Sequence, residues 1–442
     1  MNAEVTIIKT AAETALAHAF TQARAQLPGD GAIAAQRDAA FDVFAKEGLP
    51  HRRVEEWKYT DLRALMREAK PLALPPGAAA KARAKQAGAL LGDVEARRLV
   101  FVDGAFVPEL SDTANLESGL AVRSLAEALT DSDPSLTAHL GKLAPLSDVA
   151  VALNTALMGD GAVIRIGAGA TIERPLHLLF VASEKPAATF VRSLVVVEKG
   201  ARVMLIESHE GPPGSDYQVN AALELFVGDE AHVDHVKIIA EGADALHVST
   251  LAVAIGAHAR FNSFTFTAGG AVVRNQLFLK FDGEGTVAGI RGATLIKGRQ
   301  HADTTLVANH IARDCQCREV FKSVLDDEAH GVFQGRIIVR PHAQKTDAKM
   351  MTRALLLSDR AEADNKPELE IFADDVQCGH GATAGALDDE LKFYLMARGI
   401  PAAEAEALLI QAFLGEAIEG IEHAGLREAL MESVAAWLKA RA

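Results

Sequence analysis

The sequence predicts a mainly β fold, in which a parallel β-helix is flanked by helical domains at both ends. From about residue 145 onward, short runs rich in Val, Ile, Leu, Phe and Thr alternate with Gly, Asp and Asn, as in LHLLF, SLVVV and ALELFV. This alternation is typical of short strands joined by turns. A second observation is a period of about 28 residues between turn glycines, which is typical of stacked coils. The glycines with this spacing are Gly200, Gly228, Gly256 and Gly285.

The predicted β-helix spans residues 145–380. Too few residues separate its strands for the crossover helix that follows each strand of a doubly wound parallel sheet. The first three turn glycines also introduce related strings, KGARVML, GDEAHVDHV and GAHARFNSF, which supports a repeating coil. Stacking lets each coil pair with the backbone of its neighbour, so that only the two ends need covering. An antiparallel sandwich with the same turn chemistry is the alternative that the pattern leaves open.

Residues 1–144 are predicted to form a mainly helical domain. Between residues 10 and 70 the chain is rich in Ala, Glu, Arg and Lys, and its apolar residues recur at helical spacing. The segment HRRVEEWKYTDLRALMREA lies in this region. Within it, Thr60 or Asp61 is expected to cap a short helix.

Residues 381–442 are predicted to form a second helical domain. Gly399 is suited to end one helix, and Pro401 to occupy the first turn of the next. That second helix carries an apolar stripe broad enough to dock on the β-helix and still offer surface to a partner. A helix pair that packs only on its own domain fits the same periodicity. The stripe consists of Leu409, Ile410, Phe413, Leu414, Ala417, Ile418 and Ile421.

Charge and cysteine content narrow the class of protein. With 59 acidic against 45 basic residues, the formal net charge is -14, which disfavours binding to nucleic acid or to anionic membranes. Three cysteines in 442 residues indicate a reducing compartment. The first 20 residues lack the pattern of a secretory signal, and no apolar run approaches the roughly 20 residues that cross a bilayer. We therefore expect a cytoplasmic protein with no nucleic-acid or membrane partner.

The sharpest chemical feature is Cys378-Gly379-His380, at the end of a predicted strand. Residues two apart on a strand share a face, so the thiolate and the imidazole can converge on one metal ion or nascent cluster. Both ligand types suit iron and its sulfides. Taken by itself, however, a CxH pair favours a buried structural cysteine beside an ordinary histidine, because metal sites normally show more ligands.

Other residues are weaker candidates for chemistry. Cys315 and Cys317 form a CxC pair, but side chains packed inside the β-helix are the better interpretation. His301 and Asp303 are expected to satisfy backbone groups at turns.

Neighbouring charges near the predicted site are expected to lie in solvent. The pair Asp374 and Asp375 does not predict a catalytic dyad, because side-by-side residues on a strand point to opposite faces. In QKTDAK, the alternation of Lys345, Asp347 and Lys349 indicates a solvated face or a subunit contact.

Long motifs of mixed chemistry fill residues 326–400. They are DDEAHGVFQGRIIVRPHAQKTDAK and LLLSDRAEADNKPELEIFADDVQCGHGATAGALDDELKFYLMARGI. HADTTLVANH and the N-terminal RRVEEWKYTDL continue the pattern more loosely. In these motifs the chain resembles the SufD branch of the SufB/SufD family. The resemblance implies a right-handed parallel β-helix between helical ends, in agreement with the repeat.

The resemblance also implies a function, that of a non-catalytic scaffold subunit for iron-sulfur cluster assembly. The implied partners are a SufB-type scaffold, bound through the β-helix, and a SufC-type ATPase, bound through the C-terminal helices, with a homodimer when the chain is alone. The chain has no GxxxxGK[ST] phosphate loop, so we expect ATP hydrolysis to come from the partner. His380 and then Cys378 match the family's cluster-associated residues, which implies transient ligands of iron or of a cluster shared with SufB, with no cofactor stably bound.

Two enzyme classes are the alternatives. IRIGAGATIERPL resembles one turn of a hexapeptide-repeat acyltransferase, but the longer period of this chain does not continue that pattern. A polysaccharide lyase on a β-helix normally offers aromatic platforms, whereas this chain has two tryptophans and three tyrosines. A purely structural assembly protein is a third alternative, which loss of cluster maturation on changing His380 would exclude.

Overall fold

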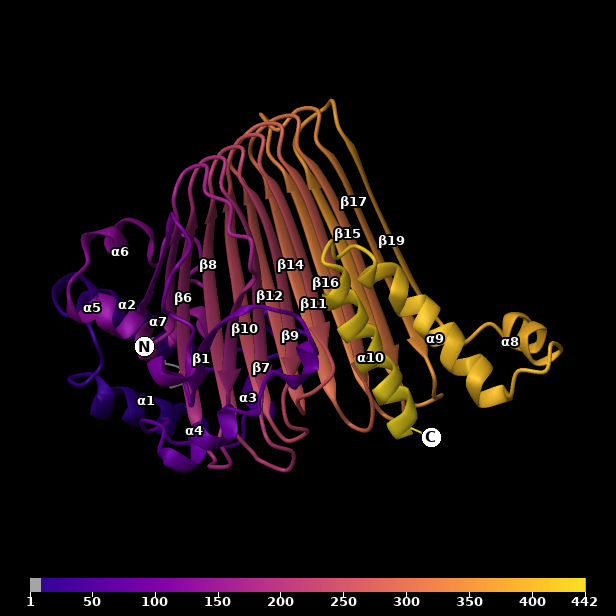
Figure 1. Ribbon diagram of the computed structural model, residues 1–442, viewed down its shortest axis with the longest axis horizontal. Coiled ribbons are helices and arrows are strands. Elements are labelled where there is room, and N and C mark those ends of the chain that lie inside the picture. The colour runs from indigo at the N-terminus through magenta and orange to yellow at the C-terminus, as the bar shows by residue number, and fades with distance from the viewer. Residues whose placement is uncertain (1–8, 442) are drawn as a thin grey trace, which may run out of the picture.

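From residue 162 onward, successive strands of the chain alternate between two sheets that face each other across one hydrophobic core (Figure 1). The computed structural model describes residues 9–441, and its centre is a right-handed parallel β-helix with helices at both ends. The predicted fold class is therefore confirmed, and the parallel registers exclude the antiparallel sandwich. Residues 1–8 and 442, which belong to the predicted helical domains, lie outside the described residues.

Within the described residues, one sheet has ten strands and the other has nine. Neighbouring strands are parallel except in the β1–β2 and β3–β4 pairs at the N-terminal end. In spatial order, the ten-stranded sheet consists of β19 (Gln377–Gly385), β17 (Asp347–Leu356), β15 (Gln316–Leu325), β13 (Val287–Ile296), β11 (Arg260–Thr267), β9 (His232–Ala240), β7 (Arg202–Glu210), β5 (Leu176–Val181), β1 (Arg97–Val102) and β2 (Ala105–Phe106). The nine-stranded sheet consists of β18 (Glu362–Ile371), β16 (His330–Val339), β14 (His301–His310), β12 (Val272–Phe281), β10 (Leu246–Ile255), β8 (Gln218–Val227), β6 (Ala188–Val197), β4 (Ala162–Ile166) and β3 (Leu120–Ser124).

The four regularly spaced turn glycines do not occupy equivalent positions in their turns. Gly200 and Gly285 have φ angles of 69° and 67°, in the left-handed region that favours glycine. Glu230 takes this conformation in the coil after Gly200, with a φ of 58°. At Gly228 and Gly256, by contrast, an added Cβ would lie 2.8 Å from a backbone nitrogen of the preceding coil. The first pair of glycines therefore relieves backbone strain, and the second pair allows two coils to approach closely.

The N-terminal end of the β-helix is closed by strands as well as by helices. β1 pairs with β5, and β3 pairs with β4, so the predicted mainly helical domain extends both sheets. Its helices α1, α2 and α7 form one apolar cluster with β10 on the outer face of the nine-stranded sheet. The helices of this region are α1 (Ala11–Ala23), α2 (Gly31–Glu47), η1 (Glu55–Trp57), α3 (Leu62–Leu65), α4 (Ala78–Ala84), η2 (Ala89–Leu91), η3 (Pro108–Leu110), α5 (Leu125–Thr130), α6 (Pro134–His139) and α7 (Val149–Leu157).

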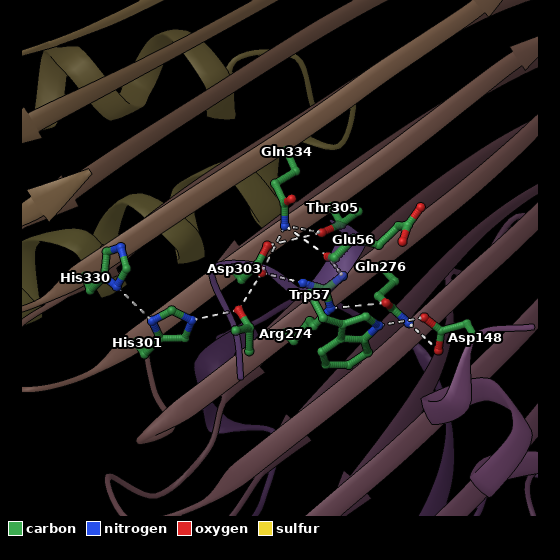
Figure 2. Close-up of polar contacts among 11 residues, drawn as sticks. Glu56, Trp57, Asp148, Arg274, Gln276, His301, Asp303, Thr305, His330 and Gln334 are labelled. Carbon is green, nitrogen blue, oxygen red and sulfur yellow. Dashed lines mark hydrogen bonds and ion pairs between the residues drawn. The ribbon is translucent and has the colours of Figure 1, made fainter. Parts of the chain in front are cut away.

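A buried ion pair attaches the N-terminal segment to the nine-stranded sheet. Arg274 on β12 is paired with Asp303 on β14, and both side chains are 0% exposed. The Arg274 guanidinium lies over the Trp57 ring, 3.9 Å from its centroid, and donates to the Glu56 carbonyl oxygen at 2.7 Å. Thr60 Oγ1 donates to the Asp303 carboxylate at 2.5 Å. Figure 2 shows the side chains of Trp57, Arg274 and Asp303 converging between the segment and the strands.

The same network corrects one sequence expectation, and the structure confirms another. His301 and Asp303 lie on β14 rather than at turns, and they contact side chains of the N-terminal segment. Of the two predicted caps, Asp61 is the one that caps α3, since its Oδ1 accepts from the Ala64 amide at 3.0 Å. Thr60 instead contacts His301 Nε2 at 2.9 Å as well as Asp303.

Two C-terminal helices, α9 (Ala402–Ile418) and α10 (Ala424–Arg441), lie on the opposite side, against the outer face of the ten-stranded sheet (Figure 1). A third helix, α8 (Asp389–Met396), precedes them and does not pack on this face. α9 packs on β13 and β15, where Ile410 and Leu414 join an apolar cluster with Phe264 and Phe266. Most of the predicted apolar stripe is therefore buried within this chain and is not available to a partner. Its buried members are Ile410, Leu414, Ala417, Ile418 and Ile421.

We predict that Arg274→Leu lowers the free energy of unfolding by about 3–5 kcal/mol, because it leaves the Asp303 carboxylate buried without its partner. Urea denaturation of the purified chain measures the change. Arg165→Leu is the matched control, since the Arg165–Glu198 pair lies at the surface and is expected to contribute about 1 kcal/mol or less. Equal losses for the two variants would show that the buried pair does not anchor the N-terminal segment.

Candidate functional site

The C-terminal end of the β-helix is open. Within the described part of the chain, β19 pairs with β17 and β18 pairs with β16, so each of these terminal strands keeps one edge without a partner strand. Their side chains are mostly exposed or half-buried, unlike those of the strands before them. The predicted site residues lie at this end, because Cys378-Gly379-His380 belongs to β19.

Cys378 and His380 leave β19 toward the interior side of the sheet. The register places Cys378 beside Ala348 and His380 beside Met350, and both neighbours are buried in the interior core. Cys378 packs half-buried against that core, whereas His380 is exposed. Burial raises the pKa of the Cys378 thiol above its ordinary value. Metal binding would therefore have to displace its proton at neutral pH.

Cys315 and Cys317 are packed inside the β-helix. Both are 0% exposed, and burial raises the pKa of each thiol. The Cys317 Sγ donates to Glu319 Oε1 at 3.5 Å, and the Cys315 Sγ donates to a backbone carbonyl oxygen at 3.4 Å. On the sheet, the strand carrying Ala348 separates Cys317 from Cys378. The structure therefore does not bring the three cysteines together.

Sequence reasoning missed Glu319. The register aligns it with Met350 and then with His380 on three successive strands of one sheet. Its carboxyl group is buried, which raises its pKa to about 8, and its Oε2 has no hydrogen-bond partner among the described residues. The sequence QCREVF could have indicated this burial, because residues two apart on a strand share a face and Glu319 follows Cys317 at that spacing.

The charged residues near the open end form ion pairs at the surface. Asp374 and Asp375 lie in the turn before β19, so the expectation that they occupy a strand is wrong. Asp375 pairs with Lys345, and both are exposed. Asp347 on β17 pairs with Arg318 at 2.5 Å. This arrangement is that of a solvated face.

Helix α8 lies beyond β19, at the end of the molecule away from the N-terminal helices (Figure 1). None of its residues is buried, although it carries five large apolar side chains, of which four are exposed. Among the described helices, none has both the length and the apolar composition needed to cross a bilayer. The exposed apolar residues of α8, with their exposed fractions, are Leu391 (51%), Phe393 (71%), Tyr394 (52%) and Met396 (43%).

Family comparisons identify the kind of β-helix that this chain forms. Residues 180–413 match the family described as the SufBD core domain of the SUF system for FeS cluster assembly, and residues 10–178 match the SufBD protein N-terminal region. The chain belongs to the SufBD family. As a SufBD protein it takes part in iron-sulfur cluster assembly, which sets aside the acyltransferase and lyase alternatives.

Curated relatives agree with this assignment. The chain is 34% identical over 420 residues to an iron-sulfur cluster assembly SufBD family protein of Synechocystis sp., covering 92% of this chain and 91% of the relative. It is 31% identical over 403 residues to the iron-sulfur cluster assembly protein SufD of Escherichia coli, covering 90% and 92% of the two chains. The chain is also 27% identical over 286 residues to SufD of Bacillus subtilis, with 64% and 65% covered.

We predict that one of the three cysteines of the native protein reacts with a thiol reagent. Cys378 is half-buried, whereas Cys315 and Cys317 are fully buried. Because the pKa of the Cys378 thiol is raised, its thiolate forms at higher pH than usual, so the labelling rate should still be rising at pH 9. Spectrophotometric thiol counting measures this, with three thiols expected in denaturant. Cys378→Ser should abolish native labelling, and fast reaction of a second thiol would contradict the burial of the CxC pair.

Proposed function

We propose that this chain is a non-catalytic scaffold that shares a nascent iron-sulfur cluster with a SufB-type partner at the open end of its β-helix. The observation that supports this most is the placement of a thiol and an imidazole on the interior side of the terminal strand β19. Cys378 and His380 are the proposed transient ligands, with His380 ranked first because it is the more accessible. Sulfur and nitrogen donors together suit iron and its sulfides. The cluster is cargo in this proposal, and neither residue holds it permanently.

The proposed SufB-type partner binds the terminal coil. Strands β18 and β19 each offer a row of backbone donors and acceptors that pairing with another chain would satisfy. At Gly379, the position of an added Cβ has no atom within 4 Å, so a second backbone can approach this strand closely. The same edges can pair with a second copy of the chain when the partner is absent. An interface on this coil would cover Cys378 and His380 between two scaffolds.

We further propose that a SufC-type ATPase binds the C-terminal helices through α8. Most of the apolar stripe of helix α9 is buried against the β-helix, whereas four apolar side chains of α8 are exposed. Residues 386–442 also contain ten acidic and five basic residues, a charge excess that favours encounter with a basic surface. A cytoplasmic location fits the three cysteines, all of which are free thiols.

Replacing His380 tests the ligand role. His380→Ala should reduce the amount of cluster assembled on the co-expressed complex by more than about 10-fold, as expected when a metal ligand is removed. The imidazole is exposed, so the free energy of unfolding should change by about 0.5 kcal/mol or less. Iron and sulfide analysis, complex yield and thermal melting are measured on the same preparations.

Two further variants make that experiment specific. Cys378→Ala should also lower cluster content, whereas His342→Ala, an exposed histidine in the turn before β17, should leave it unchanged. If His380→Ala assembles a full complement of cluster at the normal rate, the histidine is not a ligand. If complex yield falls together with cluster content, the defect lies in association instead.

A single charge on α8 tests the ATPase surface. Phe393→Glu should abolish co-purification with the ATPase and leave the melting temperature unchanged, because this side chain is 71% exposed. Leu74→Glu, at a residue 78% exposed near the N-terminal helices, is the matched control. This variant is sharper than deletion of residues 386–442, which would uncover the apolar cluster beneath α9. Undiminished ATPase binding by Phe393→Glu would exclude α8 as the contact.

A further inference from the structure

A second group of chemical side chains lies inside the β-helix, far along the chain from the open end. On β7, Glu207 and His209 continue the inward alternation of Val203 and Leu205, which belong to the interior core. Glu241 follows β9, and His247 lies on β10 of the facing sheet. Each of the ionisable members is at most 6% exposed. Two sheets thus enclose a polar cluster where an apolar core would otherwise continue.

The His209 ring is oriented by a carboxylate. Its Nε2 lies 2.7 Å from Glu207 Oε1, and the same carboxylate pairs with Lys237 Nζ at 3.2 Å. Burial alone would raise the pKa of Glu207, but Lys237 and hydrogen bonds from His209 and His235 hold it well below its ordinary value. A carboxylate that accepts from one ring nitrogen is the usual support of a metal-binding histidine, because it directs the other nitrogen at the ion. Here this leaves Nδ1 of His209 to face a ligand.

Glu241 and His247 complete the arrangement. Glu241 Oε1 lies 2.9 Å from His247 Nδ1, and its Oε2 accepts a hydrogen bond from the Tyr217 hydroxyl. The His247 ring lies edge-on to the His209 ring, with centroids 4.7 Å apart. Its Nε2 is buried and has no hydrogen-bond partner among the described residues. The polar groups here are therefore incompletely satisfied by the protein, which is rare in a folded interior.

We propose that His209, Glu241 and His247 bind one divalent first-row transition metal ion inside the β-helix. One ligand atom from each residue lies within 4.8 Å of the others, close enough to surround a single ion. Two imidazoles and one carboxylate with open positions form a ligand set suited to Fe(II) and Zn(II). His247 binds as a neutral imidazole, which offers one ring nitrogen to the ion and keeps its proton on the other, so no proton has to leave the site.

The charge and the space around the cluster fit an ion. Glu207 and Glu241 bring two carboxylates, which are opposed by Lys237. A cavity of about 20 Å³ adjoins His209 and Glu241, which is room for one water or one ion. Asp103, in the β1–β2 turn, also lines this cavity, which therefore extends from His209 and Glu241 toward the N-terminal side, whereas His247 does not line it. This site is separate from Cys378 and His380, and it does not depend on the scaffold proposal.

Titration with Co²⁺ tests the site on the full-length chain after chelator treatment. The wild type should bind one Co²⁺ with visible ligand-field bands and no sulfur-to-metal charge-transfer band, and its melting temperature should rise with Co²⁺ concentration. Glu241→Gln and His209→Asn should each weaken binding by more than about 10-fold. Competition by Fe²⁺ under anaerobic conditions should remove the Co²⁺ spectrum.

Two controls make the result decisive. His177→Asn changes a buried histidine on β5 that contacts Ser208, and it should bind Co²⁺ as the wild type does. The double variant Cys378→Ala, His380→Ala should also retain binding, which distinguishes this site from the open end. The proposal is overturned if the wild type binds no Co²⁺, if a thiolate charge-transfer band appears, or if folded Glu241→Gln binds normally. If one site variant fails to fold, absence of Co²⁺ binding by the wild type still overturns the proposal, and the other site variant still tests the location of the ion.

Discussion

Main-chain hydrogen bonding between successive coils is the constraint on which the rest of this structure depends. Most interior strands pair over ten residues with one strand on each side, so the coils have nearly equal length and their inward side chains fall into columns. A stack of such coils has two ends, and each end exposes strand edges. At the N-terminal end the sheets finish in the short antiparallel strands β2 and β3, and helices cover the nearby sheet face, whereas at the C-terminal end they finish in the long parallel strands β18 and β19. The asymmetry of the molecule, and the place of its candidate ligands, follow from this difference.

The columns also determine how chemistry is distributed inside the β-helix. Residues about one coil apart in the sequence become neighbours across a ladder, so Glu319 and His380 share one column with Met350 between them. Burying a charged side chain costs free energy unless an opposite charge pairs with it. Glu207 forms such a pair with Lys237, which lies beside it on the adjacent strand of the same sheet. The interior therefore holds ionisable groups near β7–β10 and near the open end, within a core that is otherwise mainly apolar.

The outer faces of the two sheets are covered by different parts of the chain, held in different ways. The N-terminal segment is attached to the nine-stranded sheet by a buried ion pair and by a cation lying over Trp57. Helices α9 and α10 cover the ten-stranded sheet mainly through apolar contact. Helix α8 belongs to neither arrangement and keeps its apolar side chains exposed. Within the SufBD family, the chain thus presents two distinct candidate surfaces, a strand edge and a helix.

The sequence by itself determined the fold class and the general position of the candidate ligands. Strand composition, the coil period and the CGH motif are local patterns, and main-chain pairing converts local patterns of this kind into a β-helix without further information. The tertiary structure decided the rest. It shows that Asp303 forms an ion pair with Arg274 and accepts a hydrogen bond from Thr60, and that most of the apolar stripe of α9 packs on the sheet. It also shows that the side chains of His209, Glu241 and His247 lie close together. These residues come from different coils or different domains. Their proximity depends on the exact length of each turn and on which face each strand turns inward, and neither is set by the few residues around any one of them.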